Sequence, residues 1–504
     1  MVRSAPVLLF VLLFLGSLLA PPTLAAPATA EPKEKKEDVY ELQKLLVDTL
    51  DQVERSYVKD ISRRQLVEAA IRGLLRELDP YSDYINPDDL KQFQTTVDAE
   101  FGGIGIQITI EDGQLKVMSP LVGTPAYRAG LIAGDQIVEI DGKSTAHITI
   151  DEAVRQLKGE PNSQVTLTII HPGKTARETV ALKREVIHIE TVLGDHRQSD
   201  DSWDFLLDKP RGIGYIRITG FSRDTAQELE KALESLKQQK LHGLIVDLRF
   251  NPGGLLTSAI EISDLFISNG RIVSTKGRNA EERVWEAHKE GTFEDFPMVI
   301  LVNRFTASAS EIVSACLQDH KRAVIMGERT WGKGSVQNVI PLEEQRSALK
   351  LTTASYRRPS GKNIHRFPDA KESDEWGVMP DKGYELKLDD GELLALIENR
   401  RQRDIVLPKS PQPPVTAIAT KDNHAPAAAS QPAKAPEKAG GVPPPSSAPA
   451  SATPAEPKST PAKPVTAKPA AAEPAEKPQE KLGFIDAQLR MAVDYLTAEL
   501  AKNP

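Results

Sequence analysis

Residues 243–250 have the sequence GLIVDLRF, an almost unbroken apolar run that ends on charged and aromatic side chains. A run without polar alternation is typical of a strand that is buried on both faces, as in a parallel sheet. Further strands are expected at IGYIRI (213–218), MVILVNR (298–304) and AVIMGE (323–328). Helices are expected at 224–238, 255–267 and 309–318. Strands that alternate with helices in this way predict an α/β domain with βαβ connections.

Two regions with different sequence patterns precede this core. Apolar residues recur at helical spacing over 39–57 and again over 62–78, which predicts two amphipathic helices. From residue 101 to about 184 the chain changes to short β-like segments separated by glycine, with a turn at Asp141-Gly142 and one short helix over 149–157. A helical N-terminal region and a small β-rich domain therefore precede the α/β core.

The two ends of the chain have their own signatures. Arg3, an apolar run over 7–20 and small residues near Ala25 predict an export signal that ends at residue 26. An uncleaved N-terminal anchor is the alternative, and both place the rest of the chain outside the cytoplasm, in the periplasm or cell envelope. Residues 408–480 are rich in Pro, Ala, Lys, Ser and Thr and lack aromatic residues, which predicts a disordered linker. The amphipathic segment after it should dock on another surface.

The predicted fold class is therefore multidomain α/β. Its parts are a signal peptide (1–26), a helical N-terminal region (38–96), a β-rich domain (97–185), the α/β core (186–407), the linker (408–480) and a C-terminal helix (481–504).

Composition excludes several kinds of function. The hydrophobic content of 40% and the charged content of 27% are ordinary for a globular protein. A net charge of -8 argues against nucleic-acid binding by an overall positive field. Cys316 is the one cysteine, so no internal disulfide can form. The nine histidines show no metal-ligand spacing, and we expect neither a metal site nor a cofactor.

One serine lies where a predicted strand passes into a helix. Residues 306–320 have the sequence TASASEIVSACLQDH, and Ser308 comes just before the helix. The dipole and free N–H groups of a helix N-terminus favour the negative oxygen that forms when a serine attacks a carbonyl. Small neighbours, Ala307 and Ala309, leave room for a substrate backbone. A plain N-cap role for Ser308 or Ser310 is the structural alternative.

A nucleophilic serine needs a base. His320 is expected at the far end of the helix, and a ten-residue helix spans about 15 Å. Lys333 follows the next strand and returns to the same sheet edge as Ser308, because successive parallel strands present equivalent ends. The position of Lys333 therefore favours it over His320.

Lysine acts as a base only when desolvation lowers its pKa from about 10.4 toward neutrality. Trp331 and the buried strands would supply the apolar surroundings of Lys333. The flanking residues Gly332 and Gly334 allow tight turns, and an exposed loop lysine between two glycines is the alternative.

Taken together, these segments resemble the carboxyl-terminal processing peptidases, the tail-specific proteases of the S41 family. DLRFNPGGLL at 247–256 and the segment from Thr306 to Gln337 follow the order of that family. The resemblance covers about three quarters of the chain and implies a peptidase core of the ClpP/crotonase-like type. Thr306 and Phe250 depart from the usual pattern, and the Pro/Ala-rich tail lies outside it.

The resemblance also assigns roles to individual residues. It implies that Ser308 is the nucleophile, Lys333 the base and Gln337 the residue that orients the lysine. The oxyanion hole would combine the N–H of Ala309 with that of either Gly253 or Gly254, and Asp319 would give structural support.

A second resemblance lies in the β-rich domain. FGGIGIQI at 101–108 and the segment at 119–142 are similar to the PDZ domain of these peptidases. The resemblance implies that a loop from Gly102 to Gly105 presents N–H groups to a terminal carboxylate and that the next strand pairs with the peptide. The candidate peptide-binding residues are Gly103, Ile104, Gly105, Ile106, Val154 and Leu157. A purely structural role in the domain core is the alternative for Ile106, Ile108, Val154 and Leu157.

The function that follows is a serine endopeptidase with a Ser–Lys dyad, which cleaves exported proteins recognised by apolar C-terminal tails. A catalytically silent PDZ scaffold and a Ser–His hydrolase that uses His320 are the alternatives. The expected partners are protein substrates, an adaptor or a second copy of the chain, and the membrane if the signal stays uncleaved; nucleic acid is not expected. The natural substrate, the need for an adaptor and the oligomeric state stay open.

Overall fold

The computed structural model describes residues 38–278, 281–406 and 484–502. The predicted export signal and the predicted linker lie outside the described residues. Contacts divide the chain into two compact units, with the boundary between Tyr84 and Ile85. The short strand β1 (Asp83–Ile85) lies at this boundary. No helix among the described residues is both long and apolar enough to cross a bilayer.

The first unit is a pair of helices, α1 (Val39–Ser56) and α2 (Arg63–Arg76). Ser62 caps α2, since its hydroxyl accepts from the N–H of Gln65 at 3.2 Å while its own N–H donates to the Gln65 side chain at 3.1 Å. No residue of α1 is buried, although the helix is amphipathic. The predicted helices are confirmed, and the apolar face of α1 is exposed.

The β-rich domain is an antiparallel sheet with strand order β3-β4-β5-β7-β8. Leu115, Ile137 and Leu167 fill its core together with Ala153 of α5. Its elements and those beside it are α3 (Pro87–Asp98), β2 (Glu100–Gly103), β3 (Ile106–Glu111), β4 (Gln114–Pro120), α4 (Pro125–Arg128), β5 (Gln136–Ile140), β6 (Lys143–Ser144), α5 (Ile150–Leu157), β7 (Gln164–Ile170), β8 (Glu178–Lys183) and β9 (Glu185–His188).

The α/β core is built on a sheet of order β10-β14-β15-β18-β19, in which β14, β15, β18 and β19 run parallel. Ile245 of β15 pairs with Tyr215 and Val299 of the neighbouring strands. The elements of this layer are β10 (Val192–Leu193), β13 (Leu206–Asp208), β14 (Ile213–Ile218), α6 (Thr225–Gln238), β15 (Gly243–Asp247), α7 (Leu256–Asp264), β18 (Met298–Val302), α8 (Ala309–Asp319) and β19 (Val324–Gly327).

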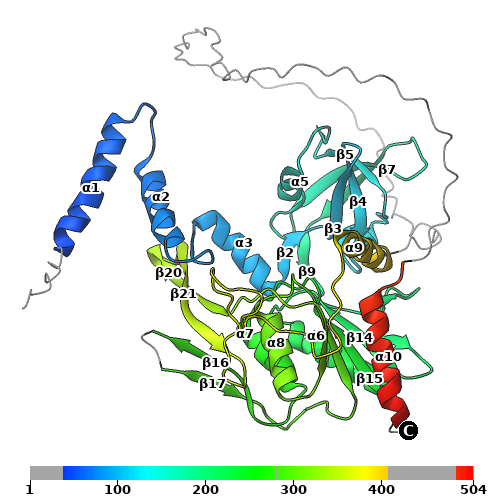
Figure 1. Ribbon diagram of the computed structural model, residues 1–504. Helices are drawn as coiled ribbons and strands as arrows, with labels where there is room; N and C mark the ends of the chain where they lie inside the picture. Colours follow the sequence, from blue (N-terminus) through cyan, green and yellow to red (C-terminus); the bar gives the residue numbers. More distant parts are fainter. Residues whose placement is uncertain (1–37, 279–280, 407–483, 503–504) are drawn as a thin grey trace, which may run out of the picture. The chain divides into compact units, whose positions relative to one another are not determined.

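Both faces of this sheet are covered, as the apolar run at 243–250 predicts. On one face Leu244 and Val246 join a core with α6, α7 and α8. On the other face Ile245 packs with Ala492 and Leu496 of α10 (Ala487–Lys502). Figure 1 shows α10, in red, alongside β14 and β15. The C-terminal helix therefore completes the third layer of the core, and its predicted docking is confirmed.

A second sheet, β21-β16-β17 with β20 paired to β21, adjoins this core. The strands β16, β17 and β20 were not predicted, because their segments mix polar and apolar residues without a long apolar run. The remaining elements are β11 (His196–Arg197), β12 (Trp203–Asp204), β16 (Arg271–Gly277), β17 (Arg283–Glu286), β20 (Ser335–Leu342), the 3-10 turn η1 (Glu343–Gln345), β21 (Ser347–Arg357) and α9 (Asp390–Asp404).

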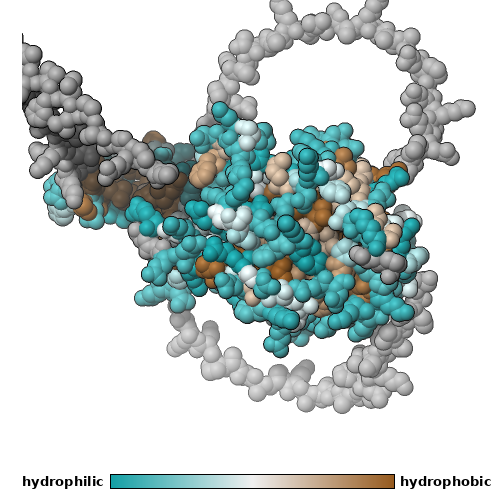
Figure 2. Space-filling view, turned by 60° about the horizontal axis from the view of Figure 1, so that its bottom comes forward, coloured by the Kyte–Doolittle hydropathy of each residue, from teal (hydrophilic) through white to brown (hydrophobic). Residues whose placement is uncertain are grey.

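The face drawn in Figure 2 is mostly hydrophilic, with hydrophobic residues in small separate groups. The large apolar side chains of the core strands are instead buried, with Ile216, Ile245 and Ile300 at 0% exposure. This partition agrees with an ordinary hydrophobic core in the α/β domain.

Candidate active site

Three loops meet at one edge of the parallel sheet. The first follows β15 and carries Gly253 and Gly254, the second follows β18 and carries Ser308, and the third follows β19 and carries Lys333. Because β15, β18 and β19 are parallel neighbours, their carboxyl ends lie at the same edge. The topology therefore brings together residues that are far apart in the sequence.

Ser308 occupies the N-cap position of α8 with backbone angles φ 59° and ψ -116°. Such a positive φ is strained for a residue with a side chain and is common where a strand turns sharply into a helix. The N–H of Ser308 donates to Glu311 Oε2 at 2.8 Å, which helps to hold this conformation. The strain fits a serine whose side chain is presented at a site.

Glu311 is a residue that the sequence analysis missed. It is 0% exposed, and its two carboxylate oxygens accept from Ser308 N–H, Thr330 Oγ1, Gly332 N–H and Lys333 N–H at 2.5–2.8 Å. Burial raises the pKa of Glu311, and the four donors oppose that rise. One carboxylate thus ties the serine loop to the lysine loop. The pattern S-x-x-E at 308–311 is a capping-box signature that could have revealed it.

The two candidate glycines differ in what their N–H groups bind. The N–H of Gly253 donates to Asn251 Oδ1 at 2.8 Å. In the described part of the chain, the N–H groups of Gly254 and Ala309 have no hydrogen-bond partner. Both residues line the cavity that also contains Ser308. The geometry therefore favours Gly254 over Gly253 as the partner of Ala309 in an oxyanion hole.

Glycine is required at both positions for steric reasons. At Gly253, with φ 98°, an added Cβ would lie 2.7 Å from the Ala307 carbonyl oxygen and from Ser308 Cβ. At Gly254, with φ 154°, it would lie 2.2 Å from the Phe221 carbonyl oxygen. The loop can approach the serine this closely only without side chains.

A cavity of about 320 Å³ gathers the predicted catalytic residues. Ser308, Lys333 and Gln337 all line it. Its other lining residues are Phe93, Val97, Phe221, Gly254, Leu255, Leu256, Ala309, Ile312, Ser335, Val336, Val339, Lys350 and Tyr356. This mostly apolar lining around a few polar groups is typical of a ligand site.

Desolvation lowers the pKa of Lys333 below its ordinary value, and the nearby Lys350 lowers it further, while Glu311 opposes the shift. The predicted source of the apolar surroundings is partly wrong. Trp331 is 53% exposed and does not line the cavity. Leu255, Val336 and other apolar residues line the same cavity as Lys333 instead. The chain turns at Gly332, which has φ 88°, and the tryptophan side chain is exposed.

Three other candidates from the sequence are Gln337, Asp319 and His320, and the structure places only the first of them at the cavity. Gln337 Nε2 donates to Ser335 Oγ at 2.9 Å and to Thr352 Oγ1 at 3.1 Å, so its amide is fixed at the cavity wall. Asp319 accepts from Arg358 Nη2 at 2.7 Å, which ties α8 to the end of β21. His320 lies at the far end of α8, and its Nε2 is 2.8 Å from the Arg271 carbonyl oxygen. The Ser–His alternative would require a residue that does not line the cavity.

Comparisons with known proteins agree with this geometry. A family model described as peptidase family S41 matches residues 212–381, and a PDZ domain model matches 116–170. A third model, for the activating protease CtpB N-terminal domain, matches 22–89. The carboxy-terminal-processing protease of Bartonella bacilliformis is 36% identical over 410 residues, which are 78% of this chain and 89% of that protein.

The chain belongs to peptidase family S41. The peptidase is also 36% identical over 318 residues to the carboxy-terminal processing protease CtpA of Bacillus subtilis, covering 63% of this chain and 65% of that protein. The solved structure of a photosystem II D1 C-terminal processing protease covers 71% of this chain and 96% of its own, with 28% identity and a TM-score of 0.40. This chain is a carboxyl-terminal processing serine protease with a PDZ domain.

The structure alters the predicted peptide-binding loop of the PDZ domain. Gly102 and Gly103 belong to β2, which pairs with β9. Glycine is required at 102, because an added Cβ there would lie 2.2 Å from the Gly159 carbonyl oxygen. The loop is therefore shorter than predicted. In the described residues, the N–H groups of Ile104 and Gly105 have no hydrogen-bond partner.

The side chains predicted to bind the peptide in the PDZ domain differ in exposure. Ile104 and Leu157 are 1% and 6% exposed and belong to the domain core. Ile106, at the start of the edge strand β3, is partly buried against that core, and Val154 of α5 is also half-buried. Ile106 and Val154 are thus the members of the predicted set whose side chains reach the surface.

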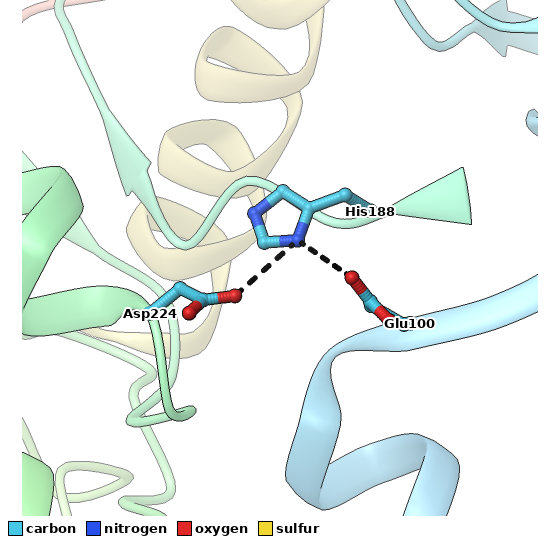
Figure 3. A group of neighbouring side chains, drawn as sticks. All are labelled: Glu100, His188 and Asp224. Atoms are coloured by element: carbon cyan, nitrogen blue, oxygen red, sulfur yellow. Dashed lines mark ion pairs between the residues drawn. The ribbon is translucent and has the colours of Figure 1, made fainter. Parts of the chain in front are cut away.

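A further group of ionisable side chains lies outside the cavity. Figure 3 shows His188 between Glu100 and Asp224, and the ligand atoms of the three residues lie within 4.8 Å of one another. His188 Nδ1 is 3.9 Å from Glu100 and 3.7 Å from Asp224, while Nε2 is 2.6 Å from Glu228. Three separate segments supply these residues, so a search for ligand spacing in the sequence could not find them.

Proposed function

We propose that Ser308 is the nucleophile of the peptidase and Lys333 its general base. Lys333 in its neutral form takes the proton of Ser308 Oγ as the oxygen bonds to the substrate carbonyl carbon. The same proton then passes to the leaving amine as the peptide C–N bond breaks. Water afterwards hydrolyses the acyl-enzyme with Lys333 again as base. The lowered pKa of Lys333 in the Ser308 cavity is the observation that carries this assignment.

In this mechanism the N–H groups of Ala309 and Gly254 stabilise the oxyanion. They line the cavity beside Ser308, and neither binds another group within the described chain. Backbone donors held in place before the reaction stabilise charge that develops in the transition state. Gln337 orients Lys333, a role that its fixed amide at the cavity wall supports. No metal or nucleotide takes part.

The substrates that we propose are exported proteins with apolar, unstructured C-terminal tails. The free N–H groups of Ile104 and Gly105 support capture of the terminal carboxylate, and the edge strand β3 supports pairing with the peptide. Ile106 and Val154 would contact the tail side chains. Engagement of the PDZ domain would also gate the active site, which protects neighbouring proteins from cleavage.

Two sequence features support the proposed location and partners of the chain. The apolar run at 7–20 supports export to the periplasm or cell envelope, with or without a retained anchor. An adaptor or a second copy of the chain would cover the exposed apolar residues of α1, among them Leu42, Leu45 and Leu46 at 48%, 65% and 53% exposure. The apolar face of α10 is buried against the sheet and does not take part in this contact.

The proposal is tested by cleavage of an unfolded protein that ends in an apolar tail. The parent chain is compared with Ser308→Ala, and the substrate with a copy whose last residues are aspartate. We expect cleavage by the parent, a fall of at least about 10³-fold in Ser308→Ala, and slower cleavage of the aspartate-tailed substrate.

Cleavage by Ser308→Ala at the parent rate would exclude the assigned nucleophile. Equal rates for both tails would exclude tail selection by apolar contacts. A parent that binds the tail and never cleaves it would favour the silent scaffold.

A further inference from the structure

The last described segment, residues 484–502, approaches the active site from behind the sheet. Its helix α10 buries Ala492 and Leu496 on the sheet face opposite α6–α8. Asp486 caps the helix, since its Oδ1 accepts from the N–H of Leu489 at 3.0 Å. The segment is therefore held both by apolar packing and by a defined polar start.

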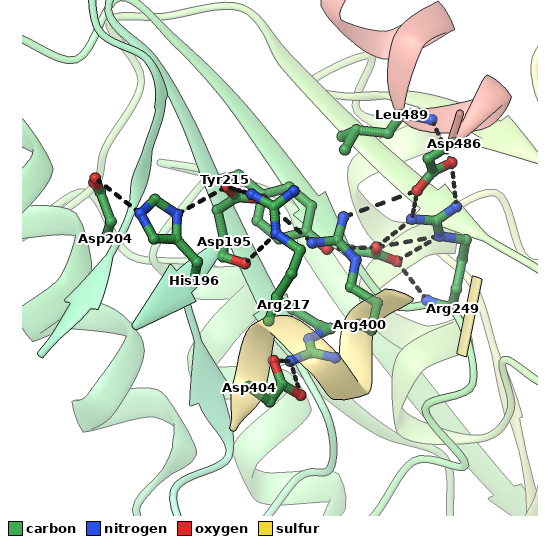
Figure 4. Close-up of polar contacts among 12 residues, drawn as sticks. Asp195, His196, Asp204, Tyr215, Arg217, Arg249, Arg400, Asp404, Asp486 and Leu489 are labelled. Atoms are coloured by element: carbon green, nitrogen blue, oxygen red, sulfur yellow. Dashed lines mark hydrogen bonds and ion pairs between the residues drawn. The ribbon is translucent and has the colours of Figure 1, made fainter. Parts of the chain in front are cut away.

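The polar start of this segment contacts a buried arginine in the loop after β15, as Figure 4 shows. Arg249 Nη1 and Nη2 donate to the two carboxylate oxygens of Asp486 at 2.9 and 2.8 Å. Nη1 also donates to Gln488 Oε1 at 3.0 Å, while Nε donates to Asp247 at 2.9 Å. The Arg249 side chain is 2% exposed, and a guanidinium buried to this degree depends on such acceptors. Two of its three side-chain partners come from the C-terminal segment.

The residue after Arg249 is also packed beside this segment. Phe250 and Phe484 pack against the same apolar cluster, formed by Leu388, Leu393 and Leu396. Phe250 has φ 63°, a strained value for a residue with a side chain. Packing of its ring stabilises this conformation. Two successive loop residues thus depend on surroundings to which residues 484–488 contribute.

The same loop leads directly to the proposed oxyanion donor. The N–H of Phe250 donates to Asn303 Oδ1 at 3.0 Å, and Asn251 Nδ2 donates to the Ile218 carbonyl oxygen at 2.7 Å. Asn251 Oδ1 in turn accepts from Gly253 N–H, and the Asn251 carbonyl oxygen accepts from Ala307 N–H at 3.0 Å. The hydrogen bonds therefore continue from Arg249 along the loop to the neighbours of Gly254 and Ser308.

We propose that residues 484–488 are a positioning element of the active site, which acts through Arg249 to place the N–H of Gly254 at the oxyanion. Asp486 is the key positioning residue. The proposal rests on the proposed role of Gly254. It extends the active site to a part of the chain that follows the segment 407–483 and that touches none of the reacting groups.

The test compares Asp486→Asn with Asp494→Asn in the full chain. The first change keeps the shape of a buried partner of Arg249 but removes its charge. The second makes the same substitution within α10, the helix that Asp486 caps, at a side chain that is 74% exposed. We expect kcat to fall about 10- to 100-fold in Asp486→Asn, since small displacements of a catalytic group have effects of this size. KM should stay within about two-fold, because a donor to the oxyanion acts in the transition state. Asp494→Asn should match the parent.

A second measurement does not depend on catalysis. Hydrogen exchange is followed by mass spectrometry in the Ser308→Ala background, with and without Asp486→Asn. We expect faster exchange in the peptide that covers 249–254 and unchanged exchange in α6. Unchanged exchange at 249–254, or an equal increase throughout the core, overturns the positioning role. Cleavage by Ser308→Ala would instead refute the proposed function, and the exchange result would still decide whether Asp486 holds the loop.

Gln488→Met is the milder variant if Asp486→Asn does not fold. It removes one neutral acceptor from Arg249 and one donor to the Leu386 carbonyl oxygen, and it keeps the volume of a side chain that is 1% exposed. We expect the same changes in kcat and in exchange at 249–254, at smaller size. A variant with parent kcat and parent exchange at 249–254 overturns the proposal.

Discussion

Two cations of the core, the half-buried Lys333 and the buried Arg249, respond to desolvation in opposite ways. Desolvation opposes the charge of both. At Lys333 it prevails, and the pKa is lowered, with Lys350 adding to the effect. At Arg249 the carboxylates of Asp247 and Asp486 outweigh it, and the pKa is raised. The groups in contact with each cation therefore decide whether its pKa is lowered or raised.

The difference separates a group that can do chemistry from one that holds structure. A lysine with a lowered pKa can lose its proton near neutral pH and accept another from a serine. An arginine between two carboxylates keeps its charge under all ordinary conditions, and it holds together the segments that carry those carboxylates. Burial alone therefore does not mark a catalytic residue.

Replacing Lys333 should give the largest effect on activity. Lys333→Met removes the proposed base but keeps an apolar side chain of similar length, so cleavage should fall about 10³-fold. The free energy of unfolding should not decrease, because a desolvated charge is lost. Cleavage rates and urea unfolding of this variant are compared with those of Lys362→Met, whose lysine is 54% exposed. Substantial cleavage by Lys333→Met would show that another residue is the base.

Replacing Arg249 should give the largest effect on stability. Arg249→Met removes the cation that hydrogen-bonds to Asp247 and Asp486, and Arg400, 3.8 Å from Asp486, replaces it only in part. The free energy of unfolding should fall by about 3–5 kcal/mol. The matched control is Arg490→Met in α10, whose arginine is 70% exposed. Urea unfolding of both variants measures the difference. Equal stability would mean that the network around Arg249 adds nothing to the fold.

Acid should weaken the Arg249 network over a defined range. Burial would raise the pKa of Asp247, but Arg249 outweighs burial and holds it at about 2. A lowered carboxyl pKa contributes stability above its unfolded value, and this contribution is lost as the pH falls through about 2. The loss should be about 2 kcal/mol, measured as unfolding free energy between pH 5 and pH 2. In Asp247→Asn the unfolding free energy should not show this loss between pH 5 and pH 2. If it falls with pH as steeply as in the parent, carboxylates other than Asp247 cause the loss of stability.

Replacing Lys350 should give the smallest effect. Because a neutral Lys333 is needed, activity should rise with pH through the lowered pKa of that lysine. Lys350→Met removes a neighbouring charge that disfavours the protonated lysine, so the rising limb should move to higher pH while the maximum rate changes little. Rates measured across the pH range on the tailed substrate check this. A limb that moves to lower pH would contradict the assignment of Lys333.

The fold of the core could be predicted because its strands are apolar throughout. The runs at 213–218, 243–250, 298–304 and 323–328 are confirmed as β14, β15, β18 and β19, and their order predicts the layers. The second sheet could not be found in the same way, because β16, β17 and β20 lack such runs. The predicted domain boundaries stay a prediction.

The catalytic candidates were found from two motifs and their order along the chain, and their assigned roles stay predictions. What could not be predicted is the set of contacts around them. Glu311 is one turn into α8, and its importance comes from donors at 330–333 that approach it only in the folded chain. The placement of Trp331 was wrong for the same reason, since the direction of a side chain beside Gly332 depends on the turn.

The sequence by itself determined which segments form the parallel sheet of the core and which of its residues could carry reactive groups, because apolar periodicity and residue chemistry are local properties. Only the tertiary structure decided which glycine offers a free N–H to the site, since Asn251 must fold back to occupy the N–H of Gly253. It also decided that the C-terminal segment holds Arg249, because a contact between residues 249 and 486 exists only when both are buried together. Hydrogen bonds and ion pairs between residues far apart in the sequence depend on how the chain packs, and a local sequence pattern does not predict them.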